Sequence, residues 1–327
     1  MNNRITFPQG GVVFPCAELE TDFYSCKNYR EEKRIVRKVL KAGKPDGYFT
    51  APLPVEFETG KDGDLLLISE NADMSNALEF TADGGRAEIY NLKRGKTYYY
   101  TVNGSEPVAF RTAESLPRWI YAPGFVNIRD CGGETTRSGK KIKQGLYYRG
   151  PRLEKSGTPE GLDALRALGI ITDLDLRKEI KDVLTESPLG ADIRFIVHPC
   201  EGYDEFITPN VRENTKQLIE YFADESIYPV YFHCHGGQDR TGTLTFMLGA
   251  ILGLDDEKLI KEYEQTALTF PDKKMSRSRK DKLKPLLKEL KKHNKSKTLS
   301  ENAVDILREC GVSEETMRII RGLLLED

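Results

Sequence analysis

The sequence predicts an α/β domain, with a central, mostly parallel sheet flanked by helices, preceded by an all-β sandwich. Three observations carry this prediction. The first 115 residues contain short alternating apolar segments separated by Gly, Asp and Asn, which is the pattern of a sandwich. From residue 116 onward, apolar strands alternate with stretches of helical periodicity. Between one such strand and the next helix lies the glycine-rich segment 233–243, a loop suited to binding an anion.

Length and composition support two domains. At 327 residues the chain exceeds the usual size of a single core, so we expect domains at 1–115 and 116–327, joined by residues 115–118. The net charge of −2 favours neither nucleic acid nor another polyanion as a partner. Six cysteines are scattered, as a reducing compartment allows, and the sequence shows neither a signal peptide nor an apolar run of about eighteen residues. We therefore expect a cytoplasmic protein without a transmembrane segment.

The first domain is expected to consist of short strands and tight turns. Its clearest strands are Leu65–Ser69, Ala87–Tyr90 and Tyr98–Val102. Asp83-Gly84 and Asn103-Gly104 are good hairpin turns, because these residue types tolerate positive φ. The string from Leu92 to Tyr100 resembles the tyrosine-corner strand of fibronectin type III domains, within the immunoglobulin-like sandwiches, with Arg94 where proline is usual. Because no catalytic constellation appears here, the domain is expected either to bind a partner or substrate, or merely to pack against its neighbour.

Helices and strands alternate in the second domain. A helix is expected to begin at Thr158-Pro159, where a cap and an N1 proline coincide, and to end at Gly169. A buried helix, apolar on nearly every face, is expected from near Arg240 to Leu254. The strands are expected at Ile170–Leu176, Ile193–Val197 and Tyr228–Phe232.

The carboxyl ends of these strands are expected to form a site along one edge of the sheet, bringing together Arg177, the loop that holds Asp204, and Cys234. Cys234 is suited to be a nucleophile, because loop N–H groups, the helix N-terminus and a guanidinium can lower the pKa of its thiol. Arg240 offers a planar fork that matches two phosphoryl oxygens. Thr241 could hydrogen-bond the sulfur and make it a better leaving group. The loop is therefore expected to hold a phosphate over a nucleophile.

Four ordered motifs in the second domain resemble a known family. The pair His233-Cys234, followed after five residues by Arg240-Thr241, resembles the signature loop of the protein tyrosine phosphatase superfamily. The fuller string, HCxxGxDRTG, is similar to that of its bacterial tyrosine and lipid (dual-specificity-like) phosphatase branch. Further segments resembling this branch are Asn127–Gly133, Leu146–Gly150, Asp175–Arg177 and the closing helix pair 302–325. The resemblance covers residues 117–327 and implies hydrolysis of phosphomonoesters through a phosphocysteine intermediate, without metal or cofactor.

The resemblance implies roles for further residues around the loop. Phosphate is expected to be bound by His235, Gly236, Gly237, Gln238 and Thr241. The supporting residues are expected to be His233, Arg129, Asp130, Arg149 and Arg177. Arg129 and Arg149 could reach the phosphate or could act as structural braces.

The general acid has two candidates. Asp204 stands thirty residues before Cys234 and follows an expected strand, whereas Asp239 lies inside the loop itself. For each, the alternative is a solvated or loop-bracing carboxylate. Glu201 and Glu205 are further candidates.

The substrate is left open by the sequence. A phosphorylated protein bearing phosphotyrosine is expected first, and a phosphoinositide or inositol phosphate is the alternative. Lipid-active relatives tend to carry lysine where this chain has Gln238, although His235 could replace that lysine in part. Segment 273–297 carries twelve Lys or Arg against two acidic residues, and it is either a solvated helix and linker or a basic lid that attracts polyphosphorylated or membrane-surface substrates.

Other classes of function fit the loop less well. A zinc site would need more ligands than Cys234 and the histidines at 233 and 235 supply. A rhodanese-type sulfur-transfer loop is shorter than this one. An inactive relative is disfavoured because Cys234 and Arg240 are both present. The remaining alternative is a binding protein that reads phosphate without turnover while the sandwich recruits partners.

Overall fold

The structure is a computed structural model of the chain. This structure describes residues 4–6, 12–13, 18–26, 30–32, 34–35, 54–114, 118–154, 157–178, 184–200, 212–269 and 273–327.

The chain divides into two compact units. The first consists of Met1–Asp22 and Ala51–Tyr121, and the second of Phe23–Thr50 and Ala122–Asp327. The described residues between 23 and 50 therefore group with the second unit, which the strand pattern of the first 115 residues does not anticipate. The predicted boundary between independently folding domains stays a prediction.

The first unit contains two sheets that share one core. Their orders are β1-β3-β6 and β2-β8-β7-β4-β5. Phe57 on β3 contacts the rings of Tyr100 on β7 and Phe110 on β8, with ring centroids 5.0 and 5.6 Å apart. The strands of these sheets are β1 (Arg4–Thr6), β2 (Val12–Val13), β3 (Val55–Glu58), β4 (Leu65–Ser69), β5 (Leu78–Thr81), β6 (Arg86–Ile89), β7 (Thr97–Val102) and β8 (Val108–Thr112). The short strand β9 (Arg118–Trp119) belongs to neither sheet.

The turns of this unit follow the predicted chemistry, with one correction. Asn103 and Gly104 both have positive φ and connect β7 to β8, as expected. The other turn lies one residue later than predicted, at Gly84-Gly85, because Asp83 and Arg86 pair with each other and the two glycines take positive φ. The hydroxyl of Tyr98 accepts a hydrogen bond from the Lys93 N–H at 2.9 Å, the contact that a tyrosine corner makes. The likeness to fibronectin type III domains itself stays a prediction.

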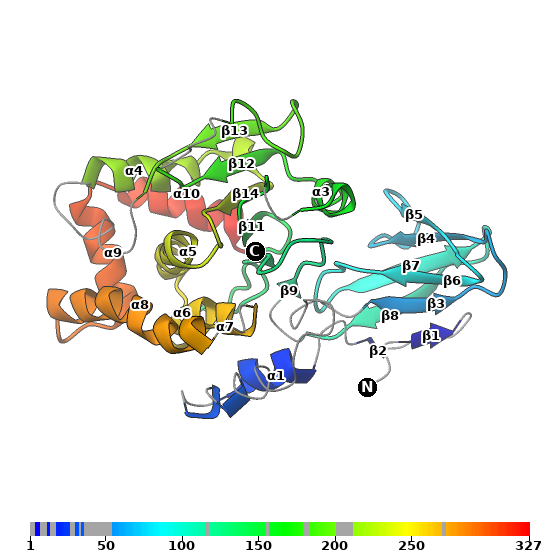
Figure 1. The fold of residues 1–327 in the computed structure, drawn as a ribbon, viewed down its shortest axis with the longest axis horizontal. Helices are drawn as coiled ribbons and strands as arrows, with labels where there is room; N and C mark the ends of the chain where they lie inside the picture. Colours follow the sequence, from blue (N-terminus) through cyan, green and yellow to red (C-terminus); the bar gives the residue numbers. More distant parts are fainter. Residues whose placement is uncertain are drawn as a thin grey trace. The chain divides into compact units, whose positions relative to one another are not determined.

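The second unit is built on a mixed sheet flanked by helices, as predicted for the phosphatase-like region. Strands follow the order β13-β12-β14-β11-β10, with β14 parallel to both of its neighbours (Figure 1). The pair β10–β11 is antiparallel. The strands are β10 (Arg129–Asp130), β11 (Tyr147–Gly150), β12 (Thr172–Asp175), β13 (Arg194–Val197) and β14 (Val230–His233).

The helix α5 (Asp239–Leu252) lies inside this unit and is buried on nearly every face, as its composition predicts. It packs against β14, α6, α9 and α10 (Figure 1). The predicted closing helix pair is present as α9 and α10. The other helices are α1 (Glu18–Ser25), α3 (Pro159–Arg166), α4 (Arg212–Tyr221), η2 (Glu225–Ile227), α6 (Asp256–Glu264), α7 (Thr266–Thr269), α8 (Lys273–His293), α9 (Leu299–Glu309) and α10 (Glu314–Leu324).

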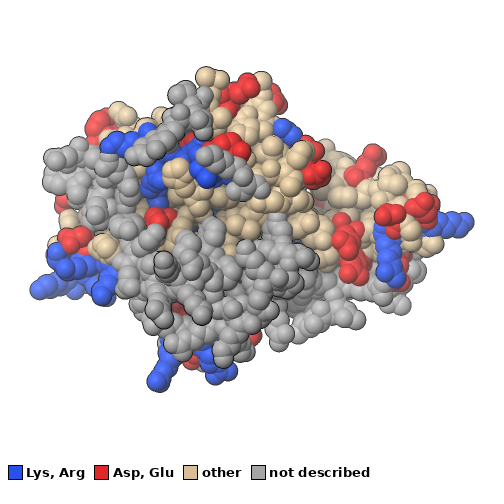
Figure 2. Space-filling model, in the orientation of Figure 1, with Lys and Arg blue, Asp and Glu red and all other residues tan. Residues whose placement is uncertain are grey.

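Most of the basic segment 273–297 forms the helix α8. Its leucines Leu283, Leu286 and Leu290 are buried at helical spacing, so this helix packs against the unit rather than extending freely. Figure 2 shows the described Lys and Arg side chains of one face in separate groups, with Asp and Glu among them. No helix in the described ranges is both long and apolar enough to cross a lipid bilayer.

Candidate active site

The predicted loop lies where β14 ends and α5 begins. Cys234 follows the fully buried strand β14, which is held between β11 and β12. Gly237 has a φ of +64°, and a Cβ atom at this position would lie 2.3 Å from the carbonyl oxygen of Gly150. Because only glycine fits this backbone conformation and this close approach, the loop can curl tightly against the end of β11.

The environment of Cys234 favours its thiolate. Burial by itself raises the pKa of this thiol, but the nearby hydroxyl and N–H of Thr241, the charge of Arg240 and the nearby N–H of Gly237 outweigh it and lower the pKa below the ordinary value. Cys234 is 4% exposed, so its sulfur lies at the buried base of the loop. Polar groups of the loop therefore favour the thiolate, although the Thr241 hydroxyl makes no hydrogen bond within the described residues.

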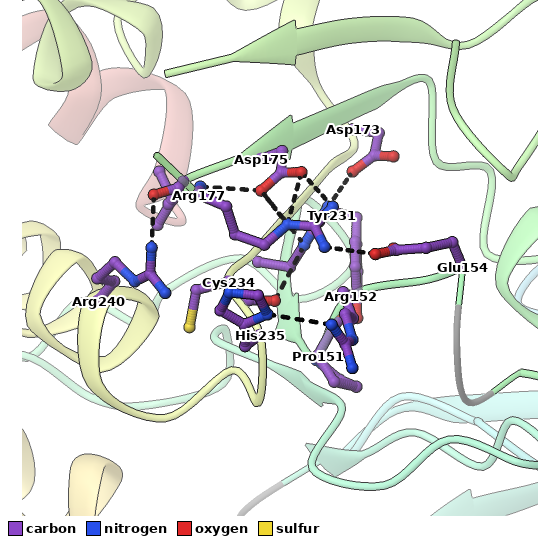
Figure 3. A network of polar contacts seen from close by, with 12 residues as sticks. Pro151, Arg152, Glu154, Asp173, Asp175, Arg177, Tyr231, Cys234, His235 and Arg240 are labelled. Atoms are coloured by element: carbon purple, nitrogen blue, oxygen red, sulfur yellow. Dashed lines mark hydrogen bonds and ion pairs between the residues drawn. The ribbon is translucent and has the colours of Figure 1, made fainter. Parts of the chain in front are cut away.

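Arg240 lies in the first turn of α5, beside Cys234 (Figure 3). Its Nη1 donates to the carbonyl oxygens of Leu176 at 3.5 Å and Cys200 at 3.4 Å. Within the described residues, Nε and Nη2 have no hydrogen-bond partner, so two donors of the fork are left to bind phosphoryl oxygens.

His233 is buried directly before Cys234. Its Nε2 lies 3.0 Å from the Asp173 carboxylate, and its Nδ1 lies 3.9 Å from Asp175 and 3.3 Å from the carbonyl oxygen of Cys234. Burial opposes the charged imidazolium, but the two carboxylates outweigh it and raise the pKa of His233 to about 8. At neutral pH the protonated ring donates to the Cys234 carbonyl and forms an ion pair with Asp173, and so it orients the start of the loop.

Arg177 is enclosed by acidic side chains. Its Nε donates to both oxygens of Asp175 at 2.9 Å, its Nη2 donates to Asp175 at 2.6 Å, and its Nη1 donates to Glu154 (Figure 3). These partners raise the pKa of the guanidinium although burial opposes its charge. Arg177 therefore supports the strand end, and its charge is largely neutralised there.

Arg149 and Arg129 lie behind the loop as braces. Arg149 donates to the carbonyl oxygens of Gly237 and Gln238, which fixes the orientation of these two loop carbonyls. Both guanidiniums also bind the carboxylate of Glu262 on α6, Arg129 at 3.0 Å and Arg149 at 2.6 Å. Of the two predicted roles, the contacts favour bracing over direct phosphate binding.

Asn127 links this brace to the loop. Its amide donates to the Gly236 carbonyl at 2.8 Å, and its side-chain oxygen accepts from Nη1 of Arg129 at 2.5 Å. The residue holds a φ of +67°, which asparagine tolerates better than most residues. A third carbonyl of the loop, that of Gly236, is thus fixed from behind.

Asp130 acts on the neighbouring backbone. Its carboxylate accepts from the N–H groups of Gly132 at 2.8 Å and Gly145 at 2.7 Å. A Cβ at Gly132 would lie 2.1 Å from the Lys143 carbonyl oxygen, so the two chain segments approach closely here. Asp130 therefore supports β10 and β11 and, through them, Arg129 and Arg149.

Gln238 is buried at the N-cap of α5. Its side-chain Nε2 has no hydrogen-bond partner within the described residues, and its residue is 4% exposed. Its carbonyl accepts from Gly242 N–H at 3.0 Å, the first backbone bond of the helix. The side chain is enclosed where a phosphate-loop lysine would be expected to reach outward.

Of the two candidate general acids, Asp239 lies within the described residues and Asp204 does not. The carboxylate of Asp239 accepts a hydrogen bond from the buried Tyr263 hydroxyl at 2.7 Å, so its position is fixed by α6. Asp204, Glu201 and Glu205 lie outside the described residues. The identity of the acid stays a prediction.

His235 is exposed and faces a residue that the sequence does not single out. Its Nδ1 lies 3.2 Å from Nη1 of Arg152, and its carbonyl accepts from the Arg152 N–H at 3.2 Å (Figure 3). Arg152 therefore belongs to the rim of the loop.

Sequence reasoning missed several residues that hold the site. Asp173 was not singled out, and Asp175 was named only within a motif, without a role. The two carry a recognisable signal, because acidic residues spaced by two in a buried strand share one face and need cationic partners. Glu262 and Tyr263 on α6 carry no such signal, since they are polar residues in an ordinary amphipathic helix and reach the loop only in three dimensions.

Comparison with known proteins places the second unit in a family. The family model described as the tyrosine phosphatase family matches residues 120–324. A Cupriavidus necator protein, provisionally named a tyrosine-protein phosphatase, is 26% identical over 161 residues, which are 42% of this chain and 59% of that protein. The chain thus spans less than two thirds of this relative.

Two solved structures are similar at low identity. The core catalytic domain of the PP-IP phosphatase SIW14 from S. cerevisiae, in complex with citrate, has 16% identity and a TM-score of 0.30, over 52% of this chain and 94% of that one. TpbA from P. aeruginosa has 14% identity and a TM-score of 0.32, over 56% and 97%. The bacterial branch with the HCxxGxDRTG loop stays a prediction.

Proposed function

The chain belongs to the tyrosine phosphatase family, and on this premise we propose that it hydrolyses phosphomonoesters through a phosphocysteine intermediate, with phosphotyrosine in proteins as its first substrate class. The prediction of a cysteine-dependent phosphatase is confirmed at the level of the family. The observation that carries the proposal is the lowered pKa of Cys234, among donors from Thr241, Gly237 and Arg240.

The reaction uses the loop twice. In the first step the Cys234 thiolate attacks phosphorus, while the free donors of Arg240 and the loop N–H groups bind the equatorial oxygens. The leaving oxygen takes a proton from the general acid. In the second step water attacks the phosphocysteine, and the Thr241 contact stabilises the departing thiolate. None of these steps requires a metal ion.

Replacing Cys234 with serine tests the chemistry. A hydroxyl is not ionised at neutral pH, so we expect hydrolysis of an aryl phosphate to fall to background. Cys131→Ser is the matched control, because burial raises the pKa of that thiol and it should contribute nothing to turnover. Activity that persists in Cys234→Ser would contradict the proposed nucleophile.

The general acid is proposed to be Asp239 or Asp204. Support for Asp239 is its place at the start of α5 and its fixed hydrogen bond to Tyr263, while Asp204 is supported by its sequence position alone. Losing the acid should slow substrates with poor leaving groups by about 10²- to 10⁴-fold and spare those with good ones. Asp239→Asn and Asp204→Asn, each assayed on alkyl and nitrophenyl phosphates, assign the role.

The substrate has one alternative. A phosphoinositide or inositol phosphate could replace phosphotyrosine, supported by the basic segment 273–297. Phosphate release from a panel of phosphopeptides and phosphoinositides separates the two substrate classes.

The first unit is proposed to be a fibronectin III-like sandwich, supported by its two sheets and the Tyr98 contact. The location of the protein is proposed to be the cytoplasm, supported by scattered cysteines.

A further inference from the structure

Arg152 and His235 form a pair at the rim of the phosphate loop. Arg152 follows β11, and its backbone N–H is bonded to the His235 carbonyl, so the two residues are held together irrespective of their side chains. The side chains also meet, with Nη1 of Arg152 3.2 Å from Nδ1 of His235. His235 is exposed and directly follows the nucleophile, so this pair lies beside the scissile phosphate.

The rim has an excess of positive charge. Within the described residues, Arg152 has no acidic partner, whereas Arg177 is neutralised by Asp175 and Glu154. Partial burial, followed by the charges of Arg240, Arg177 and Arg152, lowers the pKa of His235, and Asp175 is the acid that opposes them. Among the described side chains, the rim therefore carries cationic groups that no acidic residue balances.

The protonation state of His235 is defined by its partner. Arginine can only donate, so Nδ1 of His235 must accept, and the ring is neutral in this contact. Protonation would turn both groups into donors facing each other at 3.2 Å. That arrangement is stable only when an anion lies between them and accepts from both.

We propose that Arg152 and His235 form a second anion subsite, which binds a phosphate group of the substrate next to the one held by Cys234 and Arg240. This inference rests on the proposed phosphatase function and, within it, favours the alternative substrate class over phosphotyrosine: phosphomonoesters with a second phosphate on a neighbouring atom.

A phosphate matches the pair better than a carboxylate does. The guanidinium and the protonated imidazole together carry two positive charges, which a phosphate dianion neutralises and a carboxylate does not. A dianion has three oxygens to share between the arginine fork and the ring nitrogen. Binding should therefore be accompanied by proton uptake at His235.

Two aryl substrates test the subsite: phenyl phosphate and 1,2-phenylene bisphosphate. The measured quantity is the ratio of kcat/KM for the bisphosphate to that for the monophosphate. We expect Arg152→Met to lower this ratio by about tenfold or more, because charge-assisted hydrogen bonds are lost, and Arg152→Lys to lower it less. Arg166→Met on α3 is the matched control and should leave the ratio unchanged. An equal ratio in wild type and Arg152→Met would overturn the subsite.

The pH dependence tests the role of His235. The ratio in the wild type should rise as the pH falls through the range in which the ring gains its proton, and this rise should disappear in His235→Gln. Taking a ratio cancels the titration of Cys234, and the glutamine variant accounts for titration of the substrate. A rise of the same size in His235→Gln would remove His235 from the subsite and contradict the proposal.

Failure of the proposed function can be distinguished from failure of the subsite. If neither aryl substrate is hydrolysed, the phosphatase proposal fails. Calorimetry on Cys234→Ser still tests the subsite in that case, since adding Arg152→Met should weaken bisphosphate binding more than monophosphate binding.

Phosphotyrosine peptides with Glu or Gln beside the phosphotyrosine form the last experiment. An Arg152-dependent preference for Glu, without one for the bisphosphate, would overturn a phosphate subsite in favour of an acidic peptide.

Discussion

His233 links Cys234 to the neighbouring strand β12 through charge. The ring is 2% exposed and lies between Asp173 and Asp175 on β12, while its Nδ1 reaches the Cys234 carbonyl. Burial alone would keep the imidazole neutral, but the two carboxylates reverse this preference. The site therefore contains a buried cation whose charge depends on pH near neutrality.

This cation makes stability depend on pH. The pKa of His233 is raised to about 8 in the folded protein from 6.5 in the unfolded chain, so its stabilisation is fully present below pH 6.5 and is lost as the pH rises through 8. The loss amounts to about 2 kcal/mol. Urea unfolding at a series of pH values from 6 to 9 measures it.

His233→Gln is the control for this titration. The variant should be less stable than the wild type at pH 6, and the fall in stability between pH 6.5 and 8 should be absent from it. An unchanged pH profile in the variant would mean that another group titrates in this range.

At the scale of elements, the loop between β14 and α5 depends on one glycine. We expect Gly237→Ala to lower kcat on an aryl phosphate by about a hundredfold, because its Cβ would collide with the Gly150 carbonyl and displace the N–H groups that face the sulfur. Gly139→Ala is the matched control, since Gly139 also has positive φ but has nothing within 4 Å of the added atom. Equal losses in both variants would attribute the effect to backbone strain alone.

The helix α6 braces the loop through consecutive residues. Glu262 binds Arg129 and Arg149, and Tyr263 binds Asp239. We expect Glu262→Gln to lower the free energy of unfolding by about 3–5 kcal/mol, because two buried guanidiniums lose their shared counter-charge. Urea unfolding and kcat on an aryl phosphate measure the two consequences, since Arg149 also positions the loop carbonyls.

Glu257→Gln is the control on the same helix. Glu257 is exposed and makes no ion pair within the described residues, so stability and kcat should both stay close to the wild-type values. A loss as large as that of Glu262→Gln would mean that helix charge in general, rather than the brace, is responsible.

At the scale of the whole molecule, the second unit includes residues from the first 50. Lys261 on α6 is buried, pairs with Glu32 at 3.1 Å, and donates to the carbonyl oxygens of Cys26 at 2.7 Å and Phe23 at 3.3 Å. These contacts connect an N-terminal segment to the helix that braces the loop. A division of the chain near residue 115 would cut through them.

A fragment of residues 116–327 should therefore be unstable for a specific reason. Without Glu32 and the two carbonyls, Lys261 is left as an unpaired charge, which costs about 3–5 kcal/mol if it stays buried. We expect Lys261→Met to stabilise the fragment and to destabilise the full chain, as measured by urea midpoints. The same sign of change in both backgrounds would contradict this role of residues 23–35.

Local pattern determined much of this protein. The buried strand, the glycine-rich turn and the apolar helix around Cys234 follow from the spacing of apolar residues and glycines, which act within a few residues of each other. The signature of Cys234, Arg240 and Thr241 led to the correct family for the same reason, because the loop is one continuous segment.

Only the tertiary structure decided what holds that loop in place. Arg129 and Glu262 are 133 residues apart, and Lys261 and Cys26 are 235 residues apart. Contacts at such separations leave no periodic trace, because they arise when the sheet and helices pack. The same packing gave the arginines different surroundings. Arg129 and Arg149 lie behind the loop and share Glu262, and Arg177 is neutralised by acidic side chains. Arg152 lies on the rim without an acidic partner among the described residues. The sequence by itself thus determined the family and the loop around Cys234, and packing decided which charges remain without an acidic partner among the described residues.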